Sequence, residues 1–122
     1  MQRRNRLSRS RDFDAVYRQG RSQATRYLVL YRFAREDDGP PRLGIAVPRK
    51  VGGSVVRNRL KRRLREAWRS REAVPAGSDY VLIARPGLAE AAEAQGFAWL
   101  TQRVDEVLGK AVGAPSRPEA AA

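Results

Sequence analysis

Hydrophobic residues recur along the chain at two spacings, and the shorter spacing marks the strands. Residues 27–33 are rich in aromatic and branched side chains, and their alternation predicts a strand. Its two faces would carry Tyr27, Val29, Tyr31 and Phe33 on one side, and Leu28 and Leu30 on the other. Residues 43–47 and 79–85 predict two more strands, and residues 22–25 a short extended segment. A Gly- and Pro-containing turn at 37–41 would place strand 43–47 antiparallel to strand 27–33.

The longer spacing, of three and four residues, predicts three helices. The strongest covers residues 55–72, with Ser54 as a candidate N-cap. Its single apolar stripe consists of Val56, Leu60, Leu64, Ala67 and Trp68. A first helix is expected between Ser10 and Gly20, with one face formed by Phe13, Val16 and Tyr17. A last amphipathic helix, whose start Gly96 leaves open, would carry on one side Phe97, Leu100, Val104, Val107, Leu108 and Ala111.

The element order α-β-β-β-α-β-α implies a sheet with helices packed against it. A length of 122 residues suits one domain with one core. We therefore expect a single α+β domain over residues 1–112, which begins with a flexible basic arm at 1–8. Residues 113–122, rich in Pro and Ala, are expected to be a disordered tail.

The composition restricts the chemistry that the side chains can perform. The chain contains no histidine and no cysteine, so the commonest general base, the commonest zinc ligand and the thiol nucleophile are missing. It also lacks a P-loop, a nucleophile elbow and any metal-ligand spacing. Its longest apolar runs fall far short of the roughly 20 residues that cross a bilayer. We expect a cytoplasmic protein without catalytic side chains of its own.

Positive charge is concentrated in one part of the chain. The net charge is +12, but residues 1–72 hold 21 basic and 7 acidic side chains, whereas residues 73–122 hold 4 and 6. Most of the cations are Arg, whose planar guanidinium binds phosphate through two parallel hydrogen bonds. A nucleotide bias of the genome can explain an excess of Arg over Lys, but it does not explain this uneven distribution.

The cations are densest in the helix predicted at 55–72. Only Glu66 and Glu72 oppose its eight basic residues, Arg57, Arg59, Lys61, Arg62, Arg63, Arg65, Arg69 and Arg71. Like charges four residues apart cost an isolated helix a few tenths of a kcal/mol per pair. A docked polyanion would remove this repulsion, whereas a merely solvated helix face usually mixes both signs. The segment therefore predicts a helix that binds nucleic acid.

Polar and aromatic residues near this helix add further candidates. Asn58 can read a base edge or a 2′-OH, hold a metal-bound water, or simply cap the helix. Phe13, Tyr17 and Tyr31 can stack on unpaired bases, but each can equally belong to the core. Trp68 and Trp99 lie on apolar stripes and are expected in the core.

The segment from Val51 to Trp68 resembles the signature of a known family, the bacterial ribonuclease P protein subunit. Arg57-Asn58-Arg59 matches the core of that signature, and Lys61-Arg62 and Arg65 continue it. The segments 10–17, 29–31, 43–45 and 79–85 agree as well, in the family's order, so that the likeness covers about residues 7–110. Pro48-Arg49-Lys50 stands where the family commonly has Ser-Lys-Lys, which keeps the charge but loses a hydroxyl and a backbone N–H.

The resemblance implies a fold like the second domain of ribosomal protein S5, a single-domain α/β sandwich with helix 55–72 in a left-handed βαβ crossover. It implies a protein component of ribonuclease P, in which a catalytic RNA with its Mg²⁺ ions removes the 5′ leader of precursor tRNA. Carried over by position, the residues that bind the RNA subunit would be Arg49, Lys50, Arg57, Asn58, Arg59, Lys61, Arg62 and Arg65. The residues that line the leader-binding cleft would be Phe13, Tyr17 and Tyr31. Neither an obligate protein partner nor a membrane is implied.

Three other functions remain open at this point. A ribosomal or RNA-assembly protein would use the same surface as a structural RNA clamp. A DNA-binding regulator would place helix 55–72 in a major groove, although the paired helix of a helix-turn-helix is missing. A nuclease that acts without an RNA partner would need a metal cluster or a general base, and the sequence offers neither.

Overall fold

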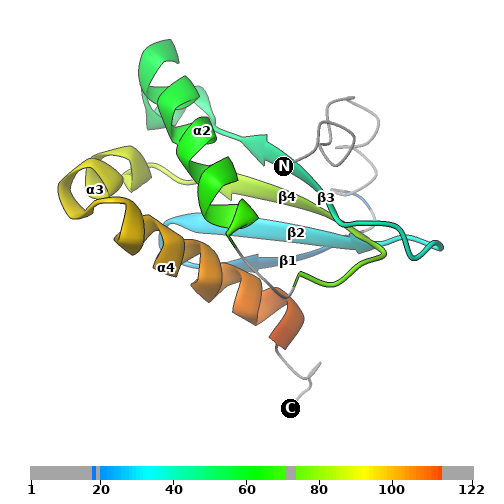
Figure 1. Ribbon diagram of the computed structural model, residues 1–122. Helices are drawn as coiled ribbons and strands as arrows, with labels where there is room; N and C mark the ends of the chain where they lie inside the picture. The colour runs from blue at the N-terminus through cyan, green and yellow to red at the C-terminus, as the bar shows by residue number, and fades with distance from the viewer. Residues whose placement is uncertain (1–17, 19, 71–73, 114–122) are drawn as a thin grey trace.

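A four-stranded sheet carries the helices on one face in the computed structural model, which describes residues 18, 20–70 and 74–113 (Figure 1). The strands are β1 (Arg21–Ala24), β2 (Leu28–Ala34), β3 (Arg42–Ala46) and β4 (Ser78–Ala84). The helices are α2 (Ser54–Arg69), α3 (Leu88–Gln95) and α4 (Phe97–Leu108), with a 3-10 turn η2 (Arg49–Val51) and a π-helical turn η3 (Gly109–Gly113). These elements confirm a single mixed α+β domain.

The order of the strands in the sheet is β1-β2-β4-β3. Strand β2 pairs antiparallel with β4, with Leu30 opposite Leu82, and β3 pairs parallel with β4. Strand β3 thus runs antiparallel to β2, as the turn at 37–41 predicts, but the two strands do not pair with each other, because β4 lies between them. The continuous apolar run of β4 suits this central position, where both of its faces are buried.

Helix α2 connects the parallel strands β3 and β4. With the helices in front of the sheet, Figure 1 shows that the crossover is left-handed. About 98% of such crossovers are right-handed, so the hand expected from the family resemblance is a distinctive feature of the fold. The crossover holds α2 across the front of the sheet, with its N-terminal end beyond the edge strand β3 (Figure 1).

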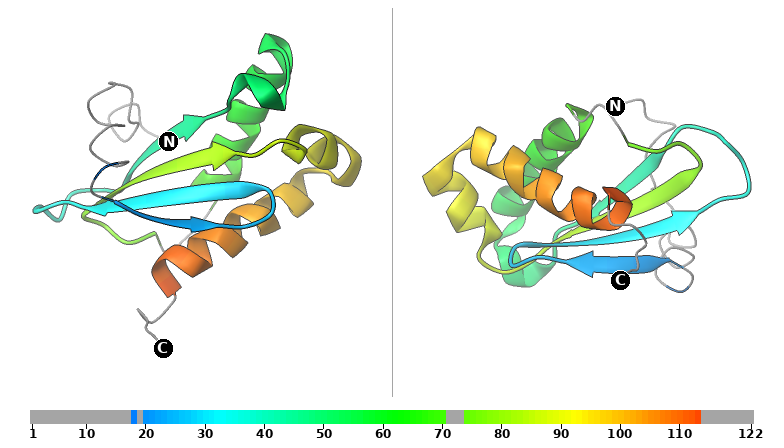
Figure 2. Two further views of the ribbon diagram at one scale, coloured as in Figure 1. Left: turned by 180° about the vertical axis from the view of Figure 1, so that it is seen from behind. Right: turned by 90° about the horizontal axis from the view of Figure 1, so that it is seen from below.

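The hydrophobic core lies between the sheet and the helices. In the left view of Figure 2 the strands lie in front and the helices behind them. Leu28, Leu30 and Leu82 point into it from the strands, and Trp68 packs on Tyr80 with 5.1 Å between ring centroids. Helix α2 adds Leu60, Leu64 and Ala67, and helix α4 adds Leu100, Val104 and Val107. Most residues of the two predicted stripes therefore lie in the core, with Val56 and Phe97 as the exceptions.

Three details differ from the predicted helices. Helix α2 begins at Ser54 with Gly53 as its N-cap, so Ser54 is not the cap. Val56, the first residue of the predicted stripe, is 39% exposed and lies outside the core, next to Gly52, where an added Cβ would stand 2.9 Å from Val56 Cγ1. The last helical region is two helices, since Gly96 interrupts it with a positive φ of 93° and leaves Phe97 exposed.

Some predicted segments lie outside the described residues. These are the basic arm at 1–8, most of the first helix at 10–20, and nearly all of the tail at 113–122.

Candidate nucleic-acid interface

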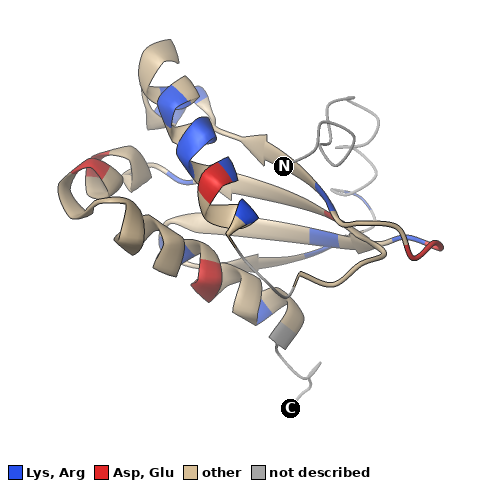
Figure 3. Cartoon of the chain, viewed as in Figure 1, with Lys and Arg blue, Asp and Glu red and all other residues tan. Residues whose placement is uncertain are grey.

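Helix α2 presents its cations on the surface because its apolar face is fixed in the core. Leu64 is fully buried, and Leu60 and Trp68 nearly so. With 3.6 residues per turn, the remaining positions point sideways or outward. Figure 3 shows that basic residues predominate along this helix, which carries a single acidic residue, whereas the charged residues of α3 are all acidic and α4 carries both signs. The basic surface is therefore a consequence of how the core orients α2.

The chain enters α2 through the short turn η2, which is anchored by the buried Val51. Arg49 and Lys50 are exposed in this turn, next to the start of α2. Pro48 has no N–H to donate, but its carbonyl accepts a hydrogen bond from Val51 N at 3.0 Å. Pro48 thus takes part in closing the turn through its main-chain carbonyl.

A first row of cations runs along one side of α2, formed by Arg57, Lys61 and Arg65 at intervals of four residues. All three are half-buried beside the core. Arg57 is held by a hydrogen bond from its Nε to the carbonyl of Gly52, 3.1 Å away. Because this bond uses one of five guanidinium donors, Arg57 is positioned and still able to bind an anion.

The outer face of α2 carries Asn58 and Arg62, both exposed. No side chain caps the start of α2, so the interpretation of Asn58 as a capping residue is wrong. One turn beyond Arg65, Arg69 forms an ion pair with Glu66 at 2.7 Å. The row of like charges inferred from the sequence is therefore partly neutralised at its C-terminal end.

A second row of cations, Arg59 and Arg63, lies on another side of α2 and contacts α3. Each donates a hydrogen bond from Nη1 to Glu93 Oε1, at 3.1 Å. The hydrogen bond from Arg59 and the positive charge of Arg63 lower the pKa of Glu93 below its ordinary value. The sequence did not indicate this cluster, because nothing in the spacing of residues 59, 63 and 93 shows that the two helices meet.

The leader-binding candidates are only partly described. Tyr31 is half-buried on the sheet face opposite the helices, where it packs with Phe33 and Ile83 around Val81. Phe13 and Tyr17 lie outside the described residues. Tyr27, which alternation assigned to the same face, instead packs edge-on against Trp99 beside the core, with ring centroids 5.1 Å apart.

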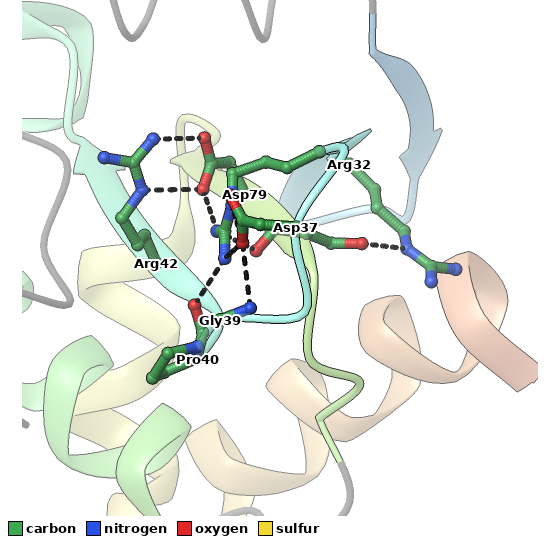
Figure 4. Close-up of polar contacts among 8 residues, drawn as sticks. Arg32, Asp37, Gly39, Pro40, Arg42 and Asp79 are labelled. Carbon is green, nitrogen blue, oxygen red and sulfur yellow. Dashed lines mark hydrogen bonds and ion pairs between the residues drawn. The ribbon is translucent and has the colours of Figure 1, made fainter.

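A second charged cluster, which sequence reasoning missed, surrounds Asp79 at the start of β4 (Figure 4). Arg42 donates to both of its carboxylate oxygens, at 2.9 Å from Nε and 2.7 Å from Nη2. Arg35 donates from Nη1 to Asp79 Oδ1 at 2.6 Å and from Nη2 to Asp37 Oδ1 at 2.9 Å. The hydrogen bond from Arg35 lowers the pKa of Asp37 below its ordinary value. These contacts join the turn after β2 to the central strand.

The described residues offer no protein metal centre. Across 18, 20–70 and 74–113, no three acidic side chains gather where they could hold a metal ion. Asp79 is occupied by two arginines. Within the same ranges, every helix is too short or too polar to span a bilayer.

An α+β domain with a cationic crossover helix on its surface defines a class of small nucleic-acid-binding proteins, and comparison with known proteins specifies which. The sequence profile of the ribonuclease P family matches residues 1–112. A ribonuclease P protein component from Acidothermus cellulolyticus is 48% identical over 109 residues, which are 88% of each chain. Another, from Brevibacillus brevis, is 45% identical over 72% of this chain and 71% of that protein.

Solved structures agree with this match. The ribonuclease P protein from Thermotoga maritima superposes with a TM-score of 0.77 at 35% identity, over 86% of this chain and 96% of that one. The ribonuclease P protein from Staphylococcus aureus gives 0.76 at 30% identity, over 88% of this chain and 95% of that one. The chain belongs to the ribonuclease P protein family, whose members are RNA-binding components of a tRNA-processing endoribonuclease.

Proposed function

We propose that this chain binds the catalytic RNA subunit of ribonuclease P and the 5′ leader of precursor tRNA, and so assists endonucleolytic removal of the leader. The observation that carries the proposal is the basic surface of α2, held outward by a buried apolar face. The RNA-subunit contacts assigned to this surface are Arg49, Lys50, Arg57, Asn58, Arg59, Lys61, Arg62 and Arg65.

The leader would lie on the sheet face opposite the helices, against Tyr31, with Phe13 and Tyr17 completing the site. Tyr31 supports this assignment because its half-buried ring belongs to β2 on the face away from α2. Stacking on aromatic rings binds unpaired bases without regard to sequence. One protein would thus contact the RNA subunit through a helix and the substrate through the sheet.

Bond cleavage is assigned to the RNA subunit and not to protein side chains. The chain has no histidine or cysteine, and its described carboxylates do not form a metal-binding group. The Mg²⁺ ions of the reaction would be bound mainly by the RNA, and no step is routed through a protein-bound metal. Arginine and lysine side chains would reduce phosphate repulsion, so that RNA and substrate associate at lower Mg²⁺ concentration.

The decisive experiment is reconstitution with in vitro transcribed ribonuclease P RNA at a low Mg²⁺ concentration. Adding the chain should raise the rate of precursor-tRNA cleavage, and a triple variant, Arg57→Ala, Lys61→Ala and Arg65→Ala, should raise it much less. No gain with the intact chain would contradict the proposal and favour a structural RNA clamp. Cleavage by the purified chain without RNA would overturn the assignment of catalysis to the RNA subunit.

A further inference from the structure

Arg59 and Arg63 converge on a single carboxylate oxygen that comes from another helix. Both donate from Nη1 to Glu93 Oε1, each at 3.1 Å. The two arginines are one helical turn apart, so their charges would repel each other without the carboxylate between them. Their side chains are 50% and 40% exposed and that of Glu93 is 55% exposed. The cluster is therefore accessible from solvent.

A phosphodiester oxygen satisfies such a pair of guanidinium groups in the same way as a carboxylate oxygen. Carboxylate and phosphate oxygens both accept charge-assisted hydrogen bonds from Arg, and in both cases the accepting oxygens lie close to the plane of the guanidinium group. Each guanidinium has five donors, and Arg59 and Arg63 direct only one each at Glu93. The two arginines are thus already arranged around an anion before RNA arrives.

We propose that Arg59 and Arg63 form a second phosphate-binding site of the RNA interface, and that Glu93 is its built-in competitor, displaced when an RNA phosphate binds. This inference rests on the proposed function and adds two residues to it, Arg63 and Glu93. The site is distinct from the row of Arg57, Lys61 and Arg65, which lies on another side of α2.

The competitor affects selectivity as well as affinity. An RNA that places a phosphate between Arg59 and Arg63 replaces the two ion pairs that it breaks. A polyanion of the wrong shape that disturbs the cluster loses both pairs without replacement. Glu93 therefore disfavours polyanions that disturb the cluster without placing a phosphate between the two arginines.

The test compares Glu93→Gln with Glu90→Gln, a matched variant on the same helix. Both changes raise the net charge by one, but the exposed Glu90 forms no ion pair with the described residues. Equilibrium binding to ribonuclease P RNA is measured for both. Exposed ion pairs are weak, so Glu93→Gln should bind roughly two- to fivefold more tightly than Glu90→Gln.

A second comparison assigns the gain to the arginine pair. In a background of Arg59→Ala and Arg63→Ala, Glu93→Gln should bind no more tightly than Glu90→Gln, because the site is absent. Thermal unfolding of each free variant verifies that all are folded.

The possible failures can be told apart. Equal binding by the two glutamine variants, or weaker binding by Glu93→Gln, would overturn the competitor role while leaving the proposed function intact. A gain that persists without the arginines would overturn the phosphate site. If no variant binds the RNA, the proposed function fails and this inference fails with it.

Discussion

Asp79 is a buried carboxylate whose charge is balanced by two arginines from a different part of the chain. It is 3% exposed, and it joins Arg35 and Arg42 on either side of the turn at 37–41 to the start of the central strand. Backbone hydrogen bonds reinforce this connection, since Gly77 N donates to the carbonyl of Gly39 at 2.8 Å. The turn is thereby attached to β4, which is not its neighbour in sequence.

Replacing Asp79 by Asn should strongly destabilise the protein. The amide keeps the shape of the side chain, but it leaves Arg35 and Arg42 without their shared negative charge. Breaking a buried ion pair by removing one partner costs about 3 kcal/mol, and urea unfolding measures the loss. Asp38→Asn, an exposed change in the same turn, serves as the control. Similar unfolding midpoints for the two variants would show that the Asp79 cluster adds no stability.

Tyr31, on strand β2, is the described residue assigned to the proposed leader site. Tyr31→Ala should weaken binding of leader-bearing precursor tRNA to the holoenzyme by about 1–3 kcal/mol, because one stacked base loses its aromatic partner. Mature tRNA, which has no leader, should bind as before. Phe33→Ala on the same strand and face is the matched control. Equal losses for precursor and mature tRNA would mean that Tyr31 only supports the fold.

At the scale of elements, Gly96 decides where α3 ends and α4 begins. Its N–H donates to the carbonyl of Ala92 at 2.9 Å, and its own carbonyl accepts from Leu100 N at 3.2 Å. The backbone makes both bonds at φ 93° and ψ 179°, a conformation open almost only to glycine. The break between the two helices therefore depends on one residue.

Gly96→Ala should destabilise the protein by about 2 kcal/mol, because a Cβ makes this backbone conformation strained. Gly109→Ala is a control in which the same substitution causes no backbone strain. Gly109 has helical angles of φ −59° and ψ −39°, and among the described residues an added Cβ would meet no atom within 4 Å beyond its own stretch of helix. That change should stabilise the protein by about 0.4–1 kcal/mol. Thermal unfolding compares the two, and a loss at both positions would contradict the conformational argument.

The sequence predicts the elements better than their arrangement. The predicted bounds of each strand agree with the structure to within one residue, because runs rich in branched and aromatic residues between turn residues are a local pattern. It does not show that β4 separates β2 from β3, because pairing depends on contacts between residues far apart in the chain. Gly96 is visible as an interruption of the last helix, but only its positive φ explains why the interruption is complete.

The same limit applies to the candidate site. The density of cations on α2 and their outward direction follow from helical spacing, and the structure confirms both. The ion pairs of Glu93 and Asp79 join elements that are 30 or more residues apart, so no local pattern shows them. The sequence marks α2 as the candidate binding helix, but its acidic partner on α3 is visible only in three dimensions.

At the scale of the whole molecule, the positive field of residues 1–72 should govern RNA affinity. If Arg57 neutralises one phosphate, Arg57→Ala should weaken binding to the RNA subunit. The slope of log affinity against log salt concentration should then fall in magnitude by about 0.7–0.9. Lys110→Ala removes one charge near the end of α4 and should leave the slope nearly unchanged. An unchanged slope for Arg57→Ala would contradict the phosphate contact.

The central position of β4 also has a consequence for the order of synthesis. Strands β2 and β3 leave the ribosome before β4, but they do not pair with each other, and β4, which joins them, is the last strand of the described sheet to be made. The chain cannot complete its sheet until residue 84 has left the exit tunnel. Until then the basic helix α2, which connects β3 to β4, has only an incomplete sheet to pack against.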